Sequence, residues 1–171
     1  MYAIAEPLYQ RALAIREQQL DPTYPDTATS LNNLAEVYHH QGKYEQAEPL
    51  YQRALTIYEQ QLGLDHPDTT TSLNNLALLY KAQKKYKQAE LLHQRALIIR
   101  EQQLGPEHPL TASSLNNLAG LYDDQGKYEQ AEPLYQRALA IYEQRLGPEH
   151  PHTQTIWKSY AALRPKIEHN A

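Results

Sequence analysis

Apolar residues recur along the chain with the spacing of one helix face. Between residues 27 and 41 they stand three, four and seven positions apart, at Leu31, Leu34, Ala35 and Tyr38. This spacing predicts an amphipathic helix over residues 27–41.

The expected ends of this helix carry residues that favour helix termini. Thr27 is the predicted N-cap, because its hydroxyl can accept a hydrogen bond from the first turn. Gly42 is the predicted C-terminal stop, because glycine adopts a left-handed backbone conformation at little cost. Gly126 stands at the equivalent place in a later copy, whereas Lys84 stands there in the middle copy and is a poorer stop.

A second helical pattern follows over residues 44–62. Its apolar residues keep the same spacing, at Ala47, Tyr51, Ala54, Tyr58 and Leu62. Pro49 lies near the start, where a missing N–H costs little. Gly63 is predicted to end the helix, and Pro67 in the following loop biases His66 away from helical conformation.

Both patterns belong to a unit of 42 residues that is repeated along the chain. The string Ser-Leu-Asn-Asn-Leu-Ala begins at Ser30, Ser72 and Ser114, and residues 27–68 differ from residues 111–152 at only ten positions. A strict period of this length is typical of a solenoid or array. Forty-two is also six heptads, but glycine and proline interrupt the pattern twice in each unit, so a coiled coil is the weaker interpretation.

The repeat predicts a single all-α solenoid domain over residues 1–164, with a frayed tail at 165–171. The domain opens with a half unit (1–26) that contains only a second-type helix, and it closes with a half unit (153–164) that contains only a first-type helix. Three whole units lie between them, at 27–68, 69–110 and 111–152. We therefore expect about eight helices and no strands.

Three phrases of the repeat carry a resemblance to a known family. They are Leu-Asn-Asn-Leu-Ala at Leu73–Ala77, Gly-Lys-Tyr-Glu-Gln-Ala-Glu-Pro-Leu at Gly42–Leu50, and Leu-Gly-Pro-Glu-His-Pro at Leu104–Pro109. They resemble the tetratricopeptide repeat in the 42-residue form found in kinesin light chains and in related bacterial, often cyanobacterial, proteins. The resemblance implies a right-handed superhelix of antiparallel helices in which first-type helices line a concave groove.

In kinesin light chains this groove holds short cargo peptides, and asparagines on the helices bond the peptide backbone. The resemblance therefore implies a protein-interaction scaffold that binds an extended peptide. The matching asparagines here are Asn32, Asn33, Asn74, Asn75, Asn116 and Asn117. We expect the first of each pair to face the groove and the second to be shared or structural; the alternative is that one of each pair only bonds to the neighbouring unit.

The copies differ most on this same predicted face. The varied residues that we expect to select the peptide are Glu36, His39, Leu78, Lys81, Asp123 and Asp124. Glu36 and His39 of the first copy lie four and seven residues after Asn32, so they share its side of the helix. Variation confined to one face predicts a ligand-selecting surface, and the alternative is an exposed face that drifts freely.

Charge is distributed unevenly over the units. The net charge is −4 over residues 27–68, +3 over residues 69–110 and −3 over residues 111–152. Four lysines gather near the middle turn, at Lys81, Lys84, Lys85 and Lys87. A basic centre between acidic flanks favours a peptide with acidic residues near its middle, although a solvated turn explains the lysines more simply.

The two terminal helices suggest an alternative, structural role. Each lacks the partner helix of its own unit and the polar cap that solenoids normally carry. We expect the face with Tyr2, Leu8 and Tyr9 to contact Trp157 and Tyr160 of another copy. Such a head-to-tail contact would let a fragment of a longer array stack end to end.

No chemistry beyond binding is predicted. Cysteine is absent, so no disulfide, thiolate metal site or cysteine nucleophile exists. The histidines are separated by whole units or point apart, no phosphate-binding glycine loop is present, and no facing pair of carboxylates occurs. We therefore predict no enzyme, no metal and no cofactor.

Charge and hydropathy limit the class of partner and the cellular location that we expect. A net charge of −4 argues against nucleic acid, whose binding sites are usually basic. No apolar run approaches the roughly 20 residues that span a bilayer. We expect a cytoplasmic chain whose partner is a protein or peptide.

Overall fold

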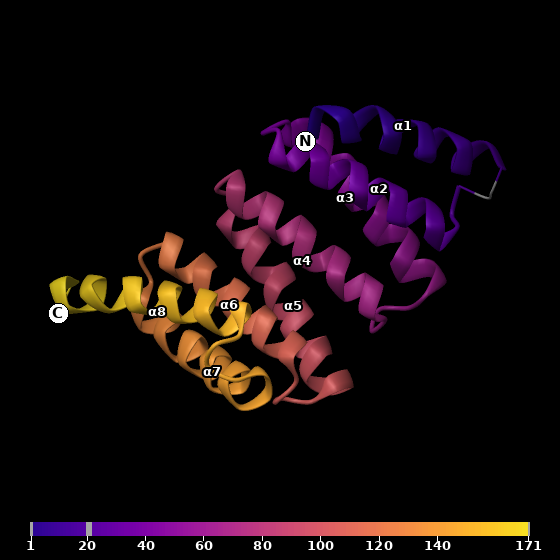
Figure 1. The fold of residues 1–171 in the computed structure, drawn as a ribbon. Coiled ribbons are helices and arrows are strands. Elements are labelled where there is room, and N and C mark those ends of the chain that lie inside the picture. The colour runs from indigo at the N-terminus through magenta and orange to yellow at the C-terminus, as the bar shows by residue number, and fades with distance from the viewer. Residues whose placement is uncertain (1, 20–21, 171) are drawn as a thin grey trace. The chain divides into compact units, whose positions relative to one another are not determined.

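The structure is a computed structural model that describes residues 2–19 and 22–170. It contains two compact units, residues 1–85 and residues 86–171. The first unit contains α1 (Tyr2–Gln19), α2 (Pro25–His40), α3 (Tyr44–Gln61) and α4 (Pro67–Ala82). The second contains α5 (Tyr86–Leu104), α6 (Pro109–Asp124), α7 (Tyr128–Leu146) and α8 (Pro151–Asn170) (Figure 1). The described residues form no strand, which confirms the all-α prediction.

Both units have the same order of helix types. Second-type helices (α1, α3, α5 and α7) alternate with first-type helices (α2, α4, α6 and α8). Within each unit, every helix contacts the next one along the chain, and the two first-type helices also contact each other. The boundary between the units falls between the two helices of the predicted repeat 69–110. The repeat boundaries themselves stay predictions.

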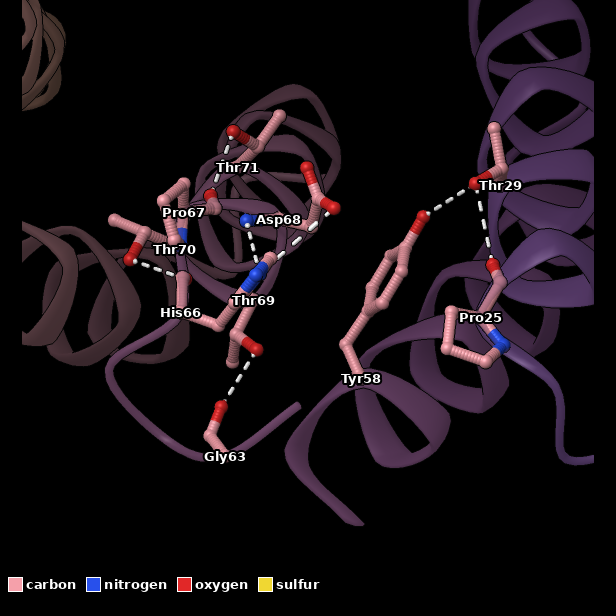
Figure 2. Close-up of polar contacts among 10 residues, drawn as sticks. All are labelled: Pro25, Thr29, Tyr58, Gly63, His66, Pro67, Asp68, Thr69, Thr70 and Thr71. Carbon is pink, nitrogen blue, oxygen red and sulfur yellow. Dashed lines mark hydrogen bonds and ion pairs between the residues drawn. The ribbon is translucent and has the colours of Figure 1, made fainter. Parts of the chain in front are cut away.

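The first-type helices begin earlier than the sequence pattern suggested. Proline is their first residue, and the preceding residue is extended: His66 has a ψ of 145° before α4. The Nδ1 atom of His66 accepts a hydrogen bond from the backbone N–H of Asp68 at 3.2 Å, so histidine is the N-cap (Figure 2). The prediction of Thr27 as an N-cap is therefore wrong, because Tyr24 is the cap residue of α2. The equivalent Thr69 instead donates to the carbonyl oxygen of Gly63 at 2.8 Å, which ties the loop to the helix.

The ends of the first-type helices agree with the sequence. Gly42 and Gly126 both have positive φ, at 74° and 72°, as a left-handed stop requires. Lys84 adopts the same conformation with a φ of 59°. A side chain at this φ is strained, because its Cβ crowds the backbone. The prediction of a poorer stop in the middle copy is thus consistent with the backbone.

Alanines allow the paired helices to approach closely. Ala35 of α2 and Ala47 and Ala54 of α3 are completely buried, and Tyr51 fills the space between them. The second unit repeats this packing, with Tyr135 in the place of Tyr51. Burial, together with the negative charges of the nearby Asp123 and Asp124, raises the pKa of Tyr135 to about 12. Tyr51 and Tyr58, with their equivalents Tyr135 and Tyr142, are therefore core residues, as their spacing predicted.

The last helix is longer than expected. The sequence predicted that Pro165 ends it and that residues 165–171 form a frayed tail, but α8 continues through Pro165 to Asn170. Proline removes one backbone hydrogen bond and crowds the carbonyl four residues earlier, but the residue that follows it makes contacts that favour the helix. Lys166 Nζ lies 2.6 Å from Asp123 Oδ1 and 5.7 Å from the centre of the Tyr128 ring.

Candidate functional site

The open side of the first-type helices is the candidate binding surface. In α2, Leu31, Leu34 and Ala35 are buried against neighbouring helices, whereas Thr29 and Glu36 are exposed. These two exposed residues lie seven positions apart, so they mark one stripe of the helix. We call the stripe on each first-type helix its open stripe. It contains residues 29, 33, 36 and 40 in α2 and the equivalent residues of α4, α6 and α8.

The first asparagine of each pair lies away from the open stripe in the first unit. Asn32 is only 9% exposed, and its Oδ1 atom accepts a hydrogen bond from Ser72 Oγ of α4 at 3.3 Å. Asn74 is 5% exposed, and its Nδ2 atom donates to the carbonyl oxygen of Thr70 at 3.1 Å. The expectation that these two residues face a groove is therefore wrong. Their amides satisfy buried polar groups, which is a structural role.

The second asparagine of each pair is the accessible one. Asn33 in α2 and Asn75 in α4 are half-buried and stand on the open stripe. In the second unit, both Asn116 and Asn117 of α6 are half-buried. An accessible amide is therefore present on α2, α4 and α6, although in the first unit it belongs to the residue that we expected to be structural.

Glu36 and His40 of the open stripe lie beside His39 at the C-terminal end of α2. The rings of His39 and His40 stack with centres 5.8 Å apart, and His40 Nε2 lies 3.6 Å from Glu36 Oε1. His39 also meets the ring of Tyr44 edge-on at 5.8 Å. Burial and the neighbouring His40 lower the pKa of His39, and the nearby Glu36 opposes this shift.

The equivalent positions of α4 carry different chemistry. Leu78 takes the place of Glu36 and is 36% exposed. Lys81 takes the place of His39 and is half-buried. The stripes of α2 and α4 therefore offer different side chains beside the same asparagine.

The second unit brings two acidic residues to the same place. Asp123 is half-buried and Asp124 is exposed at the end of α6. The carboxylate of Asp123 is bonded to Lys166 of α8. Glu36, His39, Leu78, Lys81, Asp123 and Asp124 thus all lie on accessible parts of first-type helices.

The comparisons with known proteins agree with this geometry. A family model described as tetratricopeptide repeat matches residues 1–60, 27–102 and 68–144. The chain belongs to the tetratricopeptide repeat family. The comparison with curated proteins found no match.

Solved structures place this tetratricopeptide repeat (TPR) chain beside kinesin-light-chain-like arrays. BtubC (BKLC) from P. vanneervenii is similar with a TM-score of 0.84 and 28% identity, over 98% of this chain and 66% of that one. A structure from Podosopora anserina, described as a kinesin light chain with nearly identical TPR-like repeats, gives a TM-score of 0.82 and 26% identity. That match covers 98% of this chain and 80% of the other. The apo form of RapI shares the fold, with a TM-score of 0.78 and 18% identity over 98% of this chain and 45% of its own.

TPR arrays are generally protein-interaction scaffolds, and members of the family are typically non-catalytic. Over the described part of the chain, no three histidine, aspartate or glutamate side chains gather as metal ligands would. None of the described helices combines the length and the apolar character that crossing a membrane requires.

The helices α1 and α8 carry exposed apolar side chains. Trp157 of α8 is 53% exposed, whereas the equivalent Leu31, Leu73 and Leu115 are completely buried. In α1, Leu8 is 64% exposed and Tyr9 is half-buried. The side chain of Tyr2 lies outside the described residues.

Tyr160 has a structural role that the sequence did not reveal. Gln136 Nε2 of α7 donates to its hydroxyl at 2.8 Å, and the hydroxyl lies 3.1 Å from Glu132 Oε1. In the other repeats this place belongs to a tyrosine one helical turn later, such as Tyr80, which accepts from Gln52 at 2.9 Å.

A polar cluster between neighbouring repeats also escaped sequence reasoning. Glu48 of α3 accepts hydrogen bonds from Gln83 at 3.2 Å, from Lys85 at 2.8 Å and from Gln52 at 3.2 Å. Burial raises the pKa of Glu48, but the hydrogen bonds from Lys85 and Gln83 outweigh it and lower the pKa overall. The signal was present, because glutamate and glutamine recur together every 42 residues, at 6 and 10, 48 and 52, 90 and 94, and 132 and 136.

Proposed function

We propose that this TPR chain is a scaffold that binds an extended peptide segment of a partner protein along the open stripes of its first-type helices. One observation carries the proposal: the accessible asparagine recurs at the same place on α2 and α4, while its neighbours change. Asn33 and Asn75 are both half-buried, and Glu36 in one stripe becomes Leu78 in the other. A constant amide beside varied side chains suits a ligand whose main chain is held alike at each repeat.

The constant asparagines and the varied residues of the stripe would have different roles in binding. An amide donates and accepts, so Asn33 and Asn75 can bond an extended backbone without reading its sequence. The varied residues would then contact the peptide side chains. Beside α2 the ligand meets Glu36 and the two histidines, and beside α4 it meets the leucine and Lys81.

A peptide-display screen against the whole chain tests the proposal. A selected peptide should lose about fivefold to 150-fold in affinity for the double variant Asn33→Ala and Asn75→Ala, because two net hydrogen bonds of about 0.5–1.5 kcal/mol each are removed. The matched control replaces Gln60 and Gln61, which are exposed amides at the end of α3. Binding to the asparagine variant that equals binding to this control would refute the assignment of the face.

A second candidate function rests on the exposed ends. The contact between α2 and α3 shows how a first-type helix packs on the second-type helix that follows it. In another copy, α8 could pack on α1 in the same way, which would cover Trp157 and Leu8. Sedimentation of the 171-residue chain at rising concentration tests this, because stacking should give growing species and a blue shift of the single tryptophan. A monomer with unchanged emission at high concentration would exclude stacking in solution.

A further inference from the structure

In each unit one first-type helix, α2 or α6, is followed by a second-type helix that begins with a tyrosine. In the first unit, His39 lies against Tyr44 with ring centres 5.8 Å apart. The equivalent residues of the second unit are Asp123 and Tyr128. The tyrosine is therefore constant between the units, and the residue at the position of His39 changes from an imidazole to a carboxylate.

In the second unit this place holds an ammonium group. Lys166 Nζ lies 2.6 Å from Asp123 Oδ1 and 5.7 Å from the centre of the Tyr128 ring. The carboxylate supplies a charge-assisted hydrogen bond, and the ring face attracts the cation. The side chain of Asp123 is only 17% exposed. With Lys166 in place, the carboxylate is therefore largely shielded from water.

Lys166 differs from the lysines that belong to the repeat. Lys43 and Lys127 also lie over tyrosine rings, each 5.4 Å from the ring centre, and they recur at fixed positions of the turn. Lys166 instead comes from the last turns of α8, beyond Pro165, and the equivalent residue of the first unit is Ala82. The place beside Asp123 thus accepts a lysine that the repeat itself does not provide.

We propose that Asp123 and Tyr128 form a subsite for a lysine side chain of a partner segment bound along α6, and that Lys166 is an internal occupant which the partner's lysine displaces. This inference deepens the proposed function and rests on it. It assigns the second unit a preference for a basic residue, which differs from the acidic peptide that the lysines of the middle repeat suggested. The same position selects different side chains in different repeats, with His39 and Asp123 as the determining residues.

An NMR titration with short peptides tests the subsite. The probes are acetyl-Ala-Ala-Lys-Ala-Ala-amide and the same peptide with glutamate in place of lysine. In the variant Lys166→Ala, the lysine peptide should shift the backbone amide signals of residues 120–128 and bind up to about fivefold more tightly than to the unmodified chain, as expected for release of an exposed ion pair. The matched control is Lys158→Ala, which removes an exposed lysine elsewhere on α8.

Two further variants separate a subsite from a general charge effect. Asp123→Asn in the Lys166→Ala background should abolish the lysine-specific shifts while the helical signal in circular dichroism is retained. Asp123→Lys, which copies Lys81 of the middle repeat, should reverse the preference toward the glutamate peptide. Equal binding of both peptides to Lys166→Ala, or shifts that survive Asp123→Asn, would overturn the proposal. A display-selected peptide that still depends on Asn33 and Asn75 would leave the proposed function standing in that case.

Discussion

Two adjacent asparagines of α2 should respond in opposite ways to the same substitution. Asn32 is buried and bonded to Ser72 of the neighbouring first-type helix, whereas Asn33 is half-buried on the open stripe. The two residues are neighbours in the same helix, and each is replaced by alanine. The difference in stability between Asn32→Ala and Asn33→Ala therefore isolates the environment of each amide.

The expected difference follows from two opposing contributions. Replacing Asn32 leaves the Ser72 hydroxyl without its acceptor, which costs about 1–3 kcal/mol for a buried polar group. Alanine forms helices better than asparagine does, which raises the free energy of unfolding by up to about 0.7 kcal/mol at either position. We therefore expect Asn32→Ala to lower the free energy of unfolding by about 1–2 kcal/mol, and Asn33→Ala to leave it unchanged or slightly higher.

Urea unfolding followed by circular dichroism at 222 nm measures this difference. Repeat proteins can unfold in stages, so the comparison uses midpoints of the two variants and of the unmodified chain under identical conditions. Asn74→Ala and Asn75→Ala repeat the test on α4, where Asn74 bonds the backbone of Thr70. If the second asparagine of each pair proves as important for stability as the first, the division into structural and accessible amides is refuted.

Three other substitutions test separate features of the fold. Lys84→Gly should raise the urea midpoint, because glycine removes up to about 1 kcal/mol of left-handed strain, and Gly126→Lys should lower it. Arg100→Ala should lower the free energy of unfolding by about 2–3 kcal/mol in urea titrations, because the buried guanidinium donates to Ser114 Oγ at 3.0 Å and to a backbone carbonyl. The pKa of Glu48 is lower in the folded chain than in the unfolded chain. The stability that Glu48 contributes is therefore fully present above the unfolded pKa of about 4.3, and it is lost as the pH falls through the folded pKa. Glu48→Gln should therefore flatten the loss of thermal stability between about pH 5 and 3.

Most of the fold could be predicted from the sequence because packing imposes a period. The second-type helix expected over residues 44–62 spans Tyr44–Gln61. Four residues of the predicted stripe are buried in it, at Ala47, Tyr51, Ala54 and Tyr58, whereas Leu62 lies past its end and is half-buried. The errors lie at helix ends. His66 and Pro67 looked like a loop by composition, yet proline suits the first helical position and histidine accepts the capping hydrogen bond. At the C-terminal end of α8, Pro165 predicts a helix end, yet the helix continues past it to Asn170.

The varied residues of the candidate site were easier to locate than the constant ones. Glu36, Leu78 and Asp124 differ between copies, and the structure leaves them accessible. A position that tolerates a glutamate, a leucine and a glycine cannot be part of a tightly packed core. Comparison of copies therefore identifies exposed positions correctly, even before any coordinates exist.

A constant residue carries no such information, because packing and recognition both keep it unchanged. Asn32 and Asn33 are identical in all three whole copies, so only their direction from the helix axis can separate them. The apolar residues of α2 define the arc that packs on second-type helices, but α2 also contacts α4, which widens the buried arc on one side. Asn32 lies on the side of α2 that contacts α4, where its contact with Ser72 is polar rather than apolar. The buried arc of a helix inside an array is thus wider than its apolar stripe, and a polar residue at the edge of the stripe is more safely assigned to the contact with the next repeat than to the ligand.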